Sequence, residues 1–118
     1  MQIEFDNNIP IYIQLVQQMK LQIISGQMKP GDRIPSVREL AMMHKVNPNT
    51  MQKALSELEE ERLIYTERTN GKFVTEDKAL IAKHKKQYAD ALVDRYFASM
   101  AGLGFDWETA ASYIRKER

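Results

Sequence analysis

The sequence predicts a mainly α-helical protein that carries one small β-hairpin. Apolar residues recur at spacings of three and four along several segments, as they do on helices with one buried face. After Leu63 the spacing shortens toward two, and the pair Asn70-Gly71 divides this stretch with a strong hairpin-turn signal. The 118 residues are enough for a compact domain with a modest core.

The first helix is expected over residues 10–25. Pro10 suits a first helical turn, where its missing N–H group is not needed, and Gly26 lies where helices commonly end in a left-handed residue. The following Lys29-Pro30-Gly31-Asp32 predicts a tight turn, and Arg33-Ile34-Pro35 is too short for more than a stub of extended chain. The predicted buried stripe is Tyr12, Leu15, Val16, Met19 and Ile23.

A second helix is predicted to begin at Ser36. Ser36 and Glu39 have the spacing of a capping box, in which the hydroxyl and the carboxylate each satisfy a backbone N–H group at the helix start. This helix can be only about nine residues long, because Asn47-Pro48 already supplies an N-cap and a first residue for the next helix. Its predicted buried residues are Val37, Leu40 and Ala41.

The third helix is expected from Pro48 to about Glu61, with Met51, Ala54, Leu55 and Leu58 on its buried face. Two short helices joined by a turn, which the aliphatic Val46 fills, form a helix-turn-helix. Strands over residues 63–68 and 72–75 complete the plan of a winged helix-turn-helix domain. The second helix of such a motif enters the DNA major groove, so the sequence predicts DNA binding.

A helical tail is predicted after the hairpin. A long helix runs from about Glu76 to Met100 until Gly102 and Gly104 break it, and Asp106 caps a last short helix. The long helix carries Leu80, Ile81, His84, Tyr88, Leu92, Tyr96 and Met100 along one broad face. We therefore expect two parts: a DNA-binding domain over residues 1–75, and a two-helix tail over residues 76–118 for dimerisation.

Composition excludes several classes of function. Without cysteine there are no disulfides, thiolate zinc sites or cysteine nucleophiles, and His44 and His84 lie far apart without carboxylates at metal-ligand spacing. We expect no metal, no cofactor and no enzymatic activity, because a nucleophile, a base and an orienting partner cannot be assembled. The sequence has no apolar run of ~18–20 residues and no basic segment before an apolar one at its N-terminus, so we expect a cytoplasmic protein without membrane contact.

The formal net charge is only +1, which gives no general basic signal for nucleic-acid binding. Residues 1–77 contain 9 Lys and Arg against 11 Asp and Glu, whereas residues 78–118 contain 8 against 5. A DNA-binding face must therefore come from local placement. The acidic run Glu57, Glu59, Glu60 and Glu61 is expected to face away from the phosphates.

Three stretches carry a family resemblance: Ile24–Ala41 (ISGQMKPGDRIPSVRELA), Val46–Thr50 (VNPNT), and Ala54–Glu59 continuing to Gly71-Lys72-Phe73-Val74. Over roughly residues 9–75 the chain resembles the GntR family of bacterial repressors, and the length and two-helix layout of its tail are similar to the YtrA-type subfamily. Two residues depart from the pattern: family members usually have glycine at the position of Arg62 and often have glycine at the position of Thr69. The resemblance implies a homodimer that binds a two-fold symmetric operator, represses genes that often encode transporters, and responds to an effector.

DNA-contacting side chains are expected at the start of the third helix, which points into the major groove. The candidates are Asn49, Thr50, Gln52 and Lys53. Asn and Gln can pair with adenine through two hydrogen bonds, and Thr can contact a phosphate or a thymine methyl group. A solvated helix face is the alternative. Pro48 stands where family members often have a basic or polar residue, which shifts specificity toward its neighbours.

Two further candidates lie at the start of the second helix. The family's arginine that matches Arg38 reaches the DNA backbone or a base, and the alternative is a surface salt bridge with Glu39 or Asp32. The backbone N–H group of Ser36 could contact a phosphate, although its capping role would explain this serine equally well.

The wing supplies the remaining DNA-contact candidates. Asn70, Gly71 and Lys72 are placed to touch a minor groove or phosphates, as wings of this family do, with Arg68 in support. The alternative is that Asn-Gly is only a good hairpin turn.

An aromatic and aliphatic stripe marks the tail as a dimerisation surface. It consists of Tyr88, Leu92, Tyr96, Phe97 and Met100 together with Trp107. A lone pair of amphipathic helices cannot bury such a face by itself, so a second copy of the chain is the expected partner. A pocket for an unidentified small-molecule effector among these aromatic residues is the alternative. For the whole chain, the competing function is a winged-helix adaptor that binds protein and no DNA, which the near-zero charge mildly favours.

Overall fold

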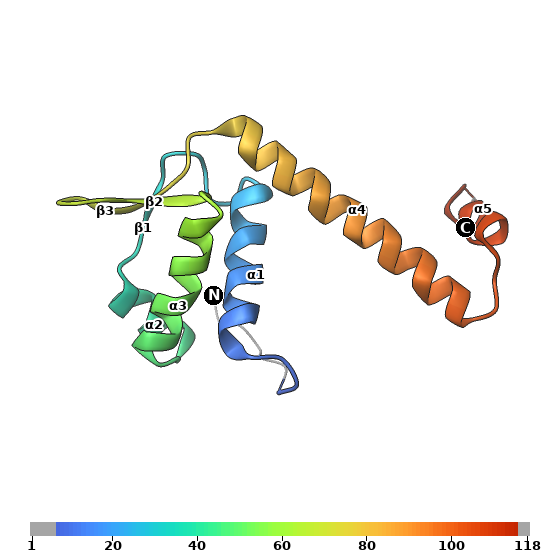
Figure 1. The fold of residues 1–118 in the computed structure, drawn as a ribbon, viewed down its shortest axis with the longest axis horizontal. Helices are drawn as coiled ribbons and strands as arrows, with labels where there is room; N and C mark the ends of the chain where they lie inside the picture. The colour runs from blue at the N-terminus through green and yellow to red at the C-terminus, as the bar shows by residue number, and fades with distance from the viewer. Residues whose placement is uncertain (1–6, 116–118) are drawn as a thin grey trace. The chain divides into compact units, whose positions relative to one another are not determined.

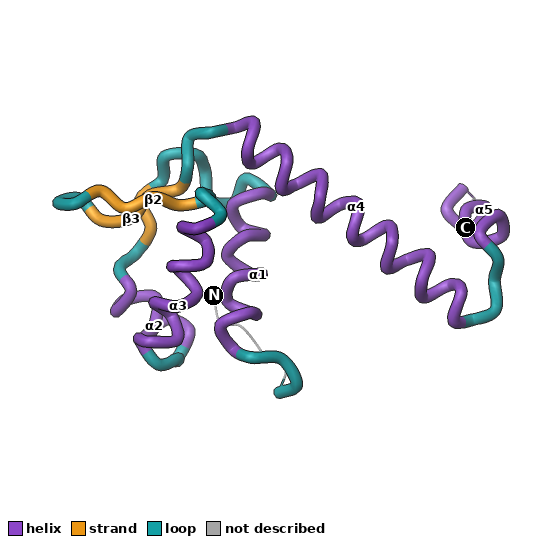
Figure 2. Tube along the Cα trace, viewed as in Figure 1, coloured by secondary structure: helices purple, strands orange, loops and turns teal. Residues whose placement is uncertain are grey.

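A computed structural model of the chain describes residues 7–115, which form two compact units divided between Ala82 and Lys83. The elements are α1 (Ile11–Ile24), β1 (Arg33–Ile34), α2 (Val37–His44), α3 (Pro48–Glu60), β2 (Ile64–Glu67), β3 (Gly71–Val74), α4 (Lys78–Gly102) and α5 (Trp107–Arg115) (Figures 1 and 2). The predicted boundary between residues 75 and 76 lies in the loop before α4, and Ile81 on α4 still packs against the core of the first unit.

The helix-turn-helix has the predicted boundaries. The Ser36 hydroxyl accepts a hydrogen bond from the Glu39 N–H group at 3.1 Å, and the Glu39 carboxylate accepts one from the Ser36 N–H group at 3.2 Å, which confirms the capping box. The predicted cap of α3 is confirmed as well, because Asn47 Oδ1 accepts a hydrogen bond from the Asn49 N–H group at 2.7 Å. Lys45 ends α2 in the left-handed conformation with φ 55°, which nothing in the sequence indicated.

The sheet has three strands, one more than the predicted hairpin, and the additional strand is β1. Its order is β1-β3-β2, and both neighbouring pairs are antiparallel. In the hairpin Ile64 pairs with Val74, whereas on the other edge of β3 Arg33 pairs with Phe73. The stub of extended chain is therefore a third strand. Two residues are too few to show a period-2 pattern, so only the folded chain reveals the pairing. Because β1 leads directly into α2, it joins the start of the helix-turn-helix to the wing.

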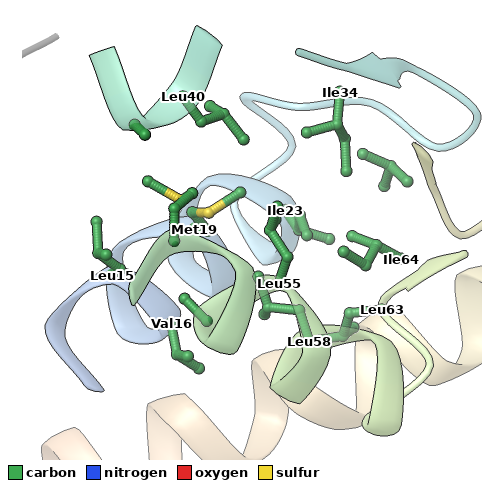
Figure 3. Packing of buried hydrophobic residues seen from close by; sticks show 14 residues of the cluster. Leu15, Val16, Met19, Ile23, Ile34, Leu40, Leu55, Leu58, Leu63 and Ile64 are labelled. Atoms are coloured by element: carbon green, nitrogen blue, oxygen red, sulfur yellow. The ribbon is translucent and has the colours of Figure 1, made fainter. Parts of the chain in front are cut away.

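The core of the first unit lies between the three helices and the sheet. Figure 3 shows Ile23 of α1, Leu55 of α3 and Ile64 of β2 converging there, each at most 1% exposed. The whole cluster is Leu15, Val16, Met19, Ile23, Ile34, Leu40, Ala41, Met51, Ala54, Leu55, Leu58, Leu63, Ile64 and Val74. The predicted buried stripes of α1, α2 and α3 all contribute to it, and Val46 packs against it from the turn, as predicted. The first unit is thus a winged helix-turn-helix with its own core.

The second unit joins the later part of α4 to α5. Asp106 caps α5 as predicted, with its Oδ1 accepting a hydrogen bond from the Thr109 N–H group at 2.8 Å. The Tyr96 hydroxyl donates to the Ala110 carbonyl at 2.7 Å, and the rings of Phe97 and Trp107 stack with centroids 5.7 Å apart. Within residues 83–115, Ala110 is the only buried residue. Among residues 7–115, no helix is long and apolar enough to cross a membrane.

Candidate nucleic-acid interface

The start of α3 presents a polar face opposite a fully buried one. Met51, Ala54, Leu55 and Leu58 are completely buried and fix the helix on the core. On the other side Asn49, Gln52 and Lys53 are exposed and Thr50 is half-buried. The packing of one face therefore determines which side chains α3 offers to a partner, as the sequence predicted.

The polar side chains on this face differ in how firmly they are held. The Asn49 side-chain amide has no hydrogen-bond partner within residues 7–115, because the bond to Asn47 uses only its backbone N–H group. Gln52 Nε2 donates to the Ser56 hydroxyl at 3.2 Å, a neutral exposed bond that a base edge can replace. Both amides can therefore reach a base without breaking the fold.

Lys53 has an intramolecular partner. Its ammonium lies 3.9 Å from the centroid of the Tyr12 ring of α1, which is the geometry of a cation–π contact. A phosphate contact by Lys53 must compete with this ring. The sequence placed Tyr12 on the buried stripe of the first helix and gave no signal for the contact.

Arg38 is exposed at the start of α2 and has no hydrogen bond or ion pair with the part of the chain that the structure describes. Neither predicted alternative partner is engaged with it. The Glu39 carboxylate accepts from Ser36, and Asp32 Oδ2 accepts from the Lys29 N–H group at 2.8 Å. The Arg38 guanidinium is therefore available to an external anion.

The N–H group of Ser36, in contrast, is occupied by the Glu39 carboxylate. Hydrogen bonds from the Ser36 backbone and hydroxyl hold the pKa of Glu39 below its usual value, so this carboxylate is charged at neutral pH. A phosphate would have to displace that charge to reach the N–H group. The structure thus favours the capping role of Ser36.

The wing tip contains Asn70 and Gly71, both predicted contacts. Asn70 Nδ2 donates to Glu67 Oε2 at 2.9 Å, and Gly71 has φ +98°, a value that favours glycine. Arg68 is exposed in the same turn and has no hydrogen bond or ion pair within residues 7–115. Arg33 of β1 also reaches this tip, where its Nε donates to the Asn70 carbonyl at 3.1 Å. Sequence reasoning missed Arg33, because the β1–β3 pairing that brings it there was not predicted.

Lys72 follows Gly71 at the start of β3, but its side chain is engaged within the chain. Its ammonium is 3.1 Å from Glu59 Oε1 and donates to the Thr66 hydroxyl at 2.9 Å, and its side chain is only 18% exposed. The hydrogen bond from Thr66, followed by that from Lys72, lowers the pKa of Glu59. This network connects the wing to the C-terminal part of α3.

The acidic run at the end of α3 is partly neutralised by this arrangement. Glu59 pairs with Lys72, and Glu61 pairs with Lys20 at 2.7 Å. Glu59 lies ~15 Å along the helix from Asn49 at the standard rise per residue. That separation exceeds the screening length of ~8 Å at physiological salt. The acidic residues therefore disfavour a polyanion at the start of α3 much less than the sequence count suggests.

The remaining titratable groups give no metal site within residues 7–115, where no cluster of potential ligands is present. His44, at the end of α2, is buried, and its Nδ1 has no hydrogen-bond partner among the described residues. Burial lowers the pKa of this histidine. It is therefore a neutral residue beside the core.

Comparisons with known proteins agree with this geometry. The family model described as "Bacterial regulatory proteins, gntR family" matches residues 11–74. The chain is 40% identical to the HTH-type transcriptional repressor YtrA of Bacillus subtilis (strain 168), with 84% of this chain and 81% of that protein covered. A family of regulatory proteins agrees with the prediction of a regulator rather than an enzyme.

Solved structures give the same assignment. A GntR family transcriptional regulator from Listeria monocytogenes superposes with a TM-score of 0.86 at 39% identity, covering 97% of this chain and 100% of that one. The structure of AraR(DBD) in complex with operator ORX1 superposes with a TM-score of 0.58 at 25% identity, covering 64% of this chain and 95% of that one. By sequence and by fold, this chain belongs to the gntR family of bacterial regulatory proteins.

Proposed function

We propose that the chain is a transcriptional repressor that binds a two-fold symmetric operator as a homodimer. The observation that carries the proposal is the start of the helix-turn-helix, where Asn49 and Gln52 of α3 are exposed and Arg38 of α2 has no partner among residues 7–115. A face with such side chains on a firmly packed helix suits readout of base edges in the major groove.

The contacts divide by chemistry. The amides of Asn49 and Gln52 have the donor and acceptor pair that recognises adenine, so we assign them to base readout. Arg38, Arg68 and the wing tip are assigned to the backbone, where phosphate contacts supply affinity and set the register. Lys53 and Lys72 are weaker candidates, since each already has an intramolecular partner.

The related proteins support the same function. The similar chain from Bacillus subtilis is named a transcriptional repressor, and the AraR DNA-binding domain was solved with its operator bound. That DNA-binding domain superposes on 64% of this chain. Control of a transporter operon remains part of the proposal and follows from the family resemblance.

The second unit supports a dimer. It leaves large apolar side chains exposed in one chain: Leu92, Val93, Leu103, Trp107 and Ile114 are all at least 48% exposed. A helix pair with one buried residue has little packing of its own, so a partner that covers these apolar side chains would stabilise it. A second copy that covers this surface would hold two recognition helices for successive major grooves, about 34–36 Å apart.

Part of the predicted dimer stripe is used within the chain. Phe97 stacks on Trp107, and the Tyr96 hydroxyl bonds to Ala110, so these side chains also hold α5 against α4. An open depression along α5 is lined by Trp107, Glu108, Ala111, Ser112 and Arg115. We propose that an effector would act on this second unit, where it would change the dimer contact.

The test is binding to the intergenic DNA upstream of the protein's own gene, measured as Kd from about 50 mM to about 300 mM salt. We expect tight, salt-sensitive binding, which Gln52→Ala and Arg38→Ala each weaken. Gln17→Ala, on an exposed position of α1, is the matched control and should leave Kd unchanged. Equal, weak binding to the upstream DNA, to random duplex and to duplexes from a genome-wide selection would overturn the proposal in favour of the adaptor.

A further inference from the structure

Arg33 is an exposed cation that the β1–β3 pairing carries to the wing. Its Nε donates to the Asn70 carbonyl at 3.1 Å, in the turn between β2 and β3. Its guanidinium also lies against Gly71, because a Cβ built there would come within 3.5 Å of Nε and of a terminal nitrogen. The Arg33 guanidinium therefore lies against the backbone of the wing tip.

This arrangement leaves most of the guanidinium unused. One N–H group is engaged with Asn70, and the terminal nitrogens keep donors that have no acceptor within residues 7–115. The fork of an arginine suits the oxygens of a phosphate, and a guanidinium already held at Nε loses less side-chain entropy on binding. Arg33 thus has the position and the donors of an anion ligand.

The expected cation of the wing is engaged elsewhere. Lys72 points to Glu59 at the end of α3 and is only 18% exposed. The charge that a wing needs near the DNA backbone must therefore come from other residues. Arg33 is also close enough to the Glu39 carboxylate at the start of α2 to help lower the pKa of that group. It lies between the wing tip and the helix that carries Arg38.

We propose that Arg33 contacts a DNA backbone phosphate and joins the wing tip and the start of α2 into one continuous binding surface. The inference rests on the proposed DNA-binding function and adds a residue from β1, an element that neither the helix-turn-helix nor the hairpin includes. Arg33 acts by direct contact, while its bond to Asn70 fixes the guanidinium at the edge of the wing.

The experiment measures operator Kd against salt for the full chain and for Arg33→Ala, Arg33→Lys and Lys29→Ala. Lys29→Ala is the matched control, because it also removes one exposed positive charge. Lys29 lies near the other end of the sheet, in the turn whose Gly31 N–H group donates to the Val74 carbonyl. Each phosphate contact that is lost reduces the slope of log K against log salt by about 0.9 and weakens binding roughly tenfold near 0.1 M salt. These changes apply to each DNA-binding unit that is bound to the DNA.

We expect Arg33→Ala to show both changes, whereas Arg33→Lys keeps the slope and Lys29→Ala keeps slope and Kd. A second measurement replaces single operator phosphates with neutral methylphosphonates. One replacement per half-site should weaken binding of the wild type and have no effect on Arg33→Ala. Arg33 is exposed, so Arg33→Ala should keep the melting temperature and remain folded.

Two results would overturn the inference while leaving the proposed function intact. The first is wild-type slope and Kd for Arg33→Ala in a preparation where Gln52→Ala still weakens binding. The second is an unchanged slope with relaxed preference at one base pair, which would make Arg33 a base reader instead. Failure of the proposed function would give a different result, because the wild-type protein would then bind operator and random duplex with equal, weak affinity.

Discussion

The ammonium of Lys72 lies 3.1 Å from Glu59 Oε1 and so connects the second strand of the wing to α3. The Thr66 hydroxyl completes this network by donating to the same oxygen at 2.6 Å. A cation that the sequence assigned to DNA is thereby used to set the position of the wing against α3.

Lys72→Met should therefore affect folding more than DNA binding. The side chain is 18% exposed and its partner 42%, so solvent screens part of the interaction, and we expect the free energy of unfolding to fall by about 1 kcal/mol. Urea unfolding measures this, and operator binding at fixed salt should weaken far less than in Arg38→Ala. A large loss of affinity with unchanged stability would mean that Lys72 leaves Glu59 to contact DNA.

Arg62→Gly should stabilise the first unit. Arg62 follows the C-terminal cap of α3 with φ 63°, in the left-handed region where a side chain is strained and glycine is not. Relief of that strain exceeds the extra entropy of glycine in the unfolded chain, and we expect a gain of about 0.5–1 kcal/mol in the free energy of unfolding. Chemical denaturation provides the measurement.

The control for this change is Glu57→Gly, which introduces the same residue at a right-handed position inside α3. It should lower the free energy of unfolding by about 1 kcal/mol. If both variants were destabilised alike, the side chain of Arg62 would contribute contacts that outweigh its backbone strain.

Stability should fall when the pH drops below 6.5, because of His44. Burial lowers the pKa of this histidine in the folded protein below the 6.5 of an unperturbed side chain. Above pH 6.5 both folded and unfolded chains hold it neutral, so it has no effect on the folding equilibrium. Below pH 6.5 the unfolded chain binds the proton first, which stabilises the unfolded state until the folded pKa is reached as well.

Thermal unfolding of wild type and His44→Gln between pH 8 and about pH 5 isolates this contribution. The difference in melting temperature between the two proteins should be constant above pH 6.5 and should shift in favour of the variant below it. His84→Gln is the control, since it replaces the other histidine of the sequence, which lies on α4 outside the core of the first unit. Parallel pH profiles for wild type and His44→Gln would contradict the assignment.

Local signals in the sequence predicted most of the first unit. The capping box at Ser36 and the Asn47-Pro48 helix start depend on neighbouring residues, so they could be read without the fold. The β1–β3 pairing joins segments far apart in the chain through two residues, and it could not be predicted. For the same reason the partners of Lys53, Lys72 and Arg33 were missed, because each contact joins two elements that only the tertiary fold brings together.

Ile114→Glu should convert a dimer into a monomer and weaken binding to a full operator. Ile114 is 60% exposed on α5, and within one chain it lies outside the Phe97–Trp107 stack, so the substitution leaves that packing intact. A charge buried in a dimer interface without a partner is strongly unfavourable. Sedimentation should give the mass of two 13.7 kDa chains for the wild type and of one for the variant.

DNA binding then separates the role of the dimer from that of the reading head. A dimer bound at one half-site holds its second head at an effective concentration near the millimolar range, and a monomer loses this advantage. The variant should therefore lose affinity for a two-half-site operator by about 10²-fold or more and keep wild-type affinity for a single half-site. Gln87→Glu adds the same charge beside the Lys86–Asp90 ion pair and should change neither mass nor affinity. A wild-type chain that sediments as a monomer, or a variant that remains dimeric, would mean that something other than a second copy covers α5.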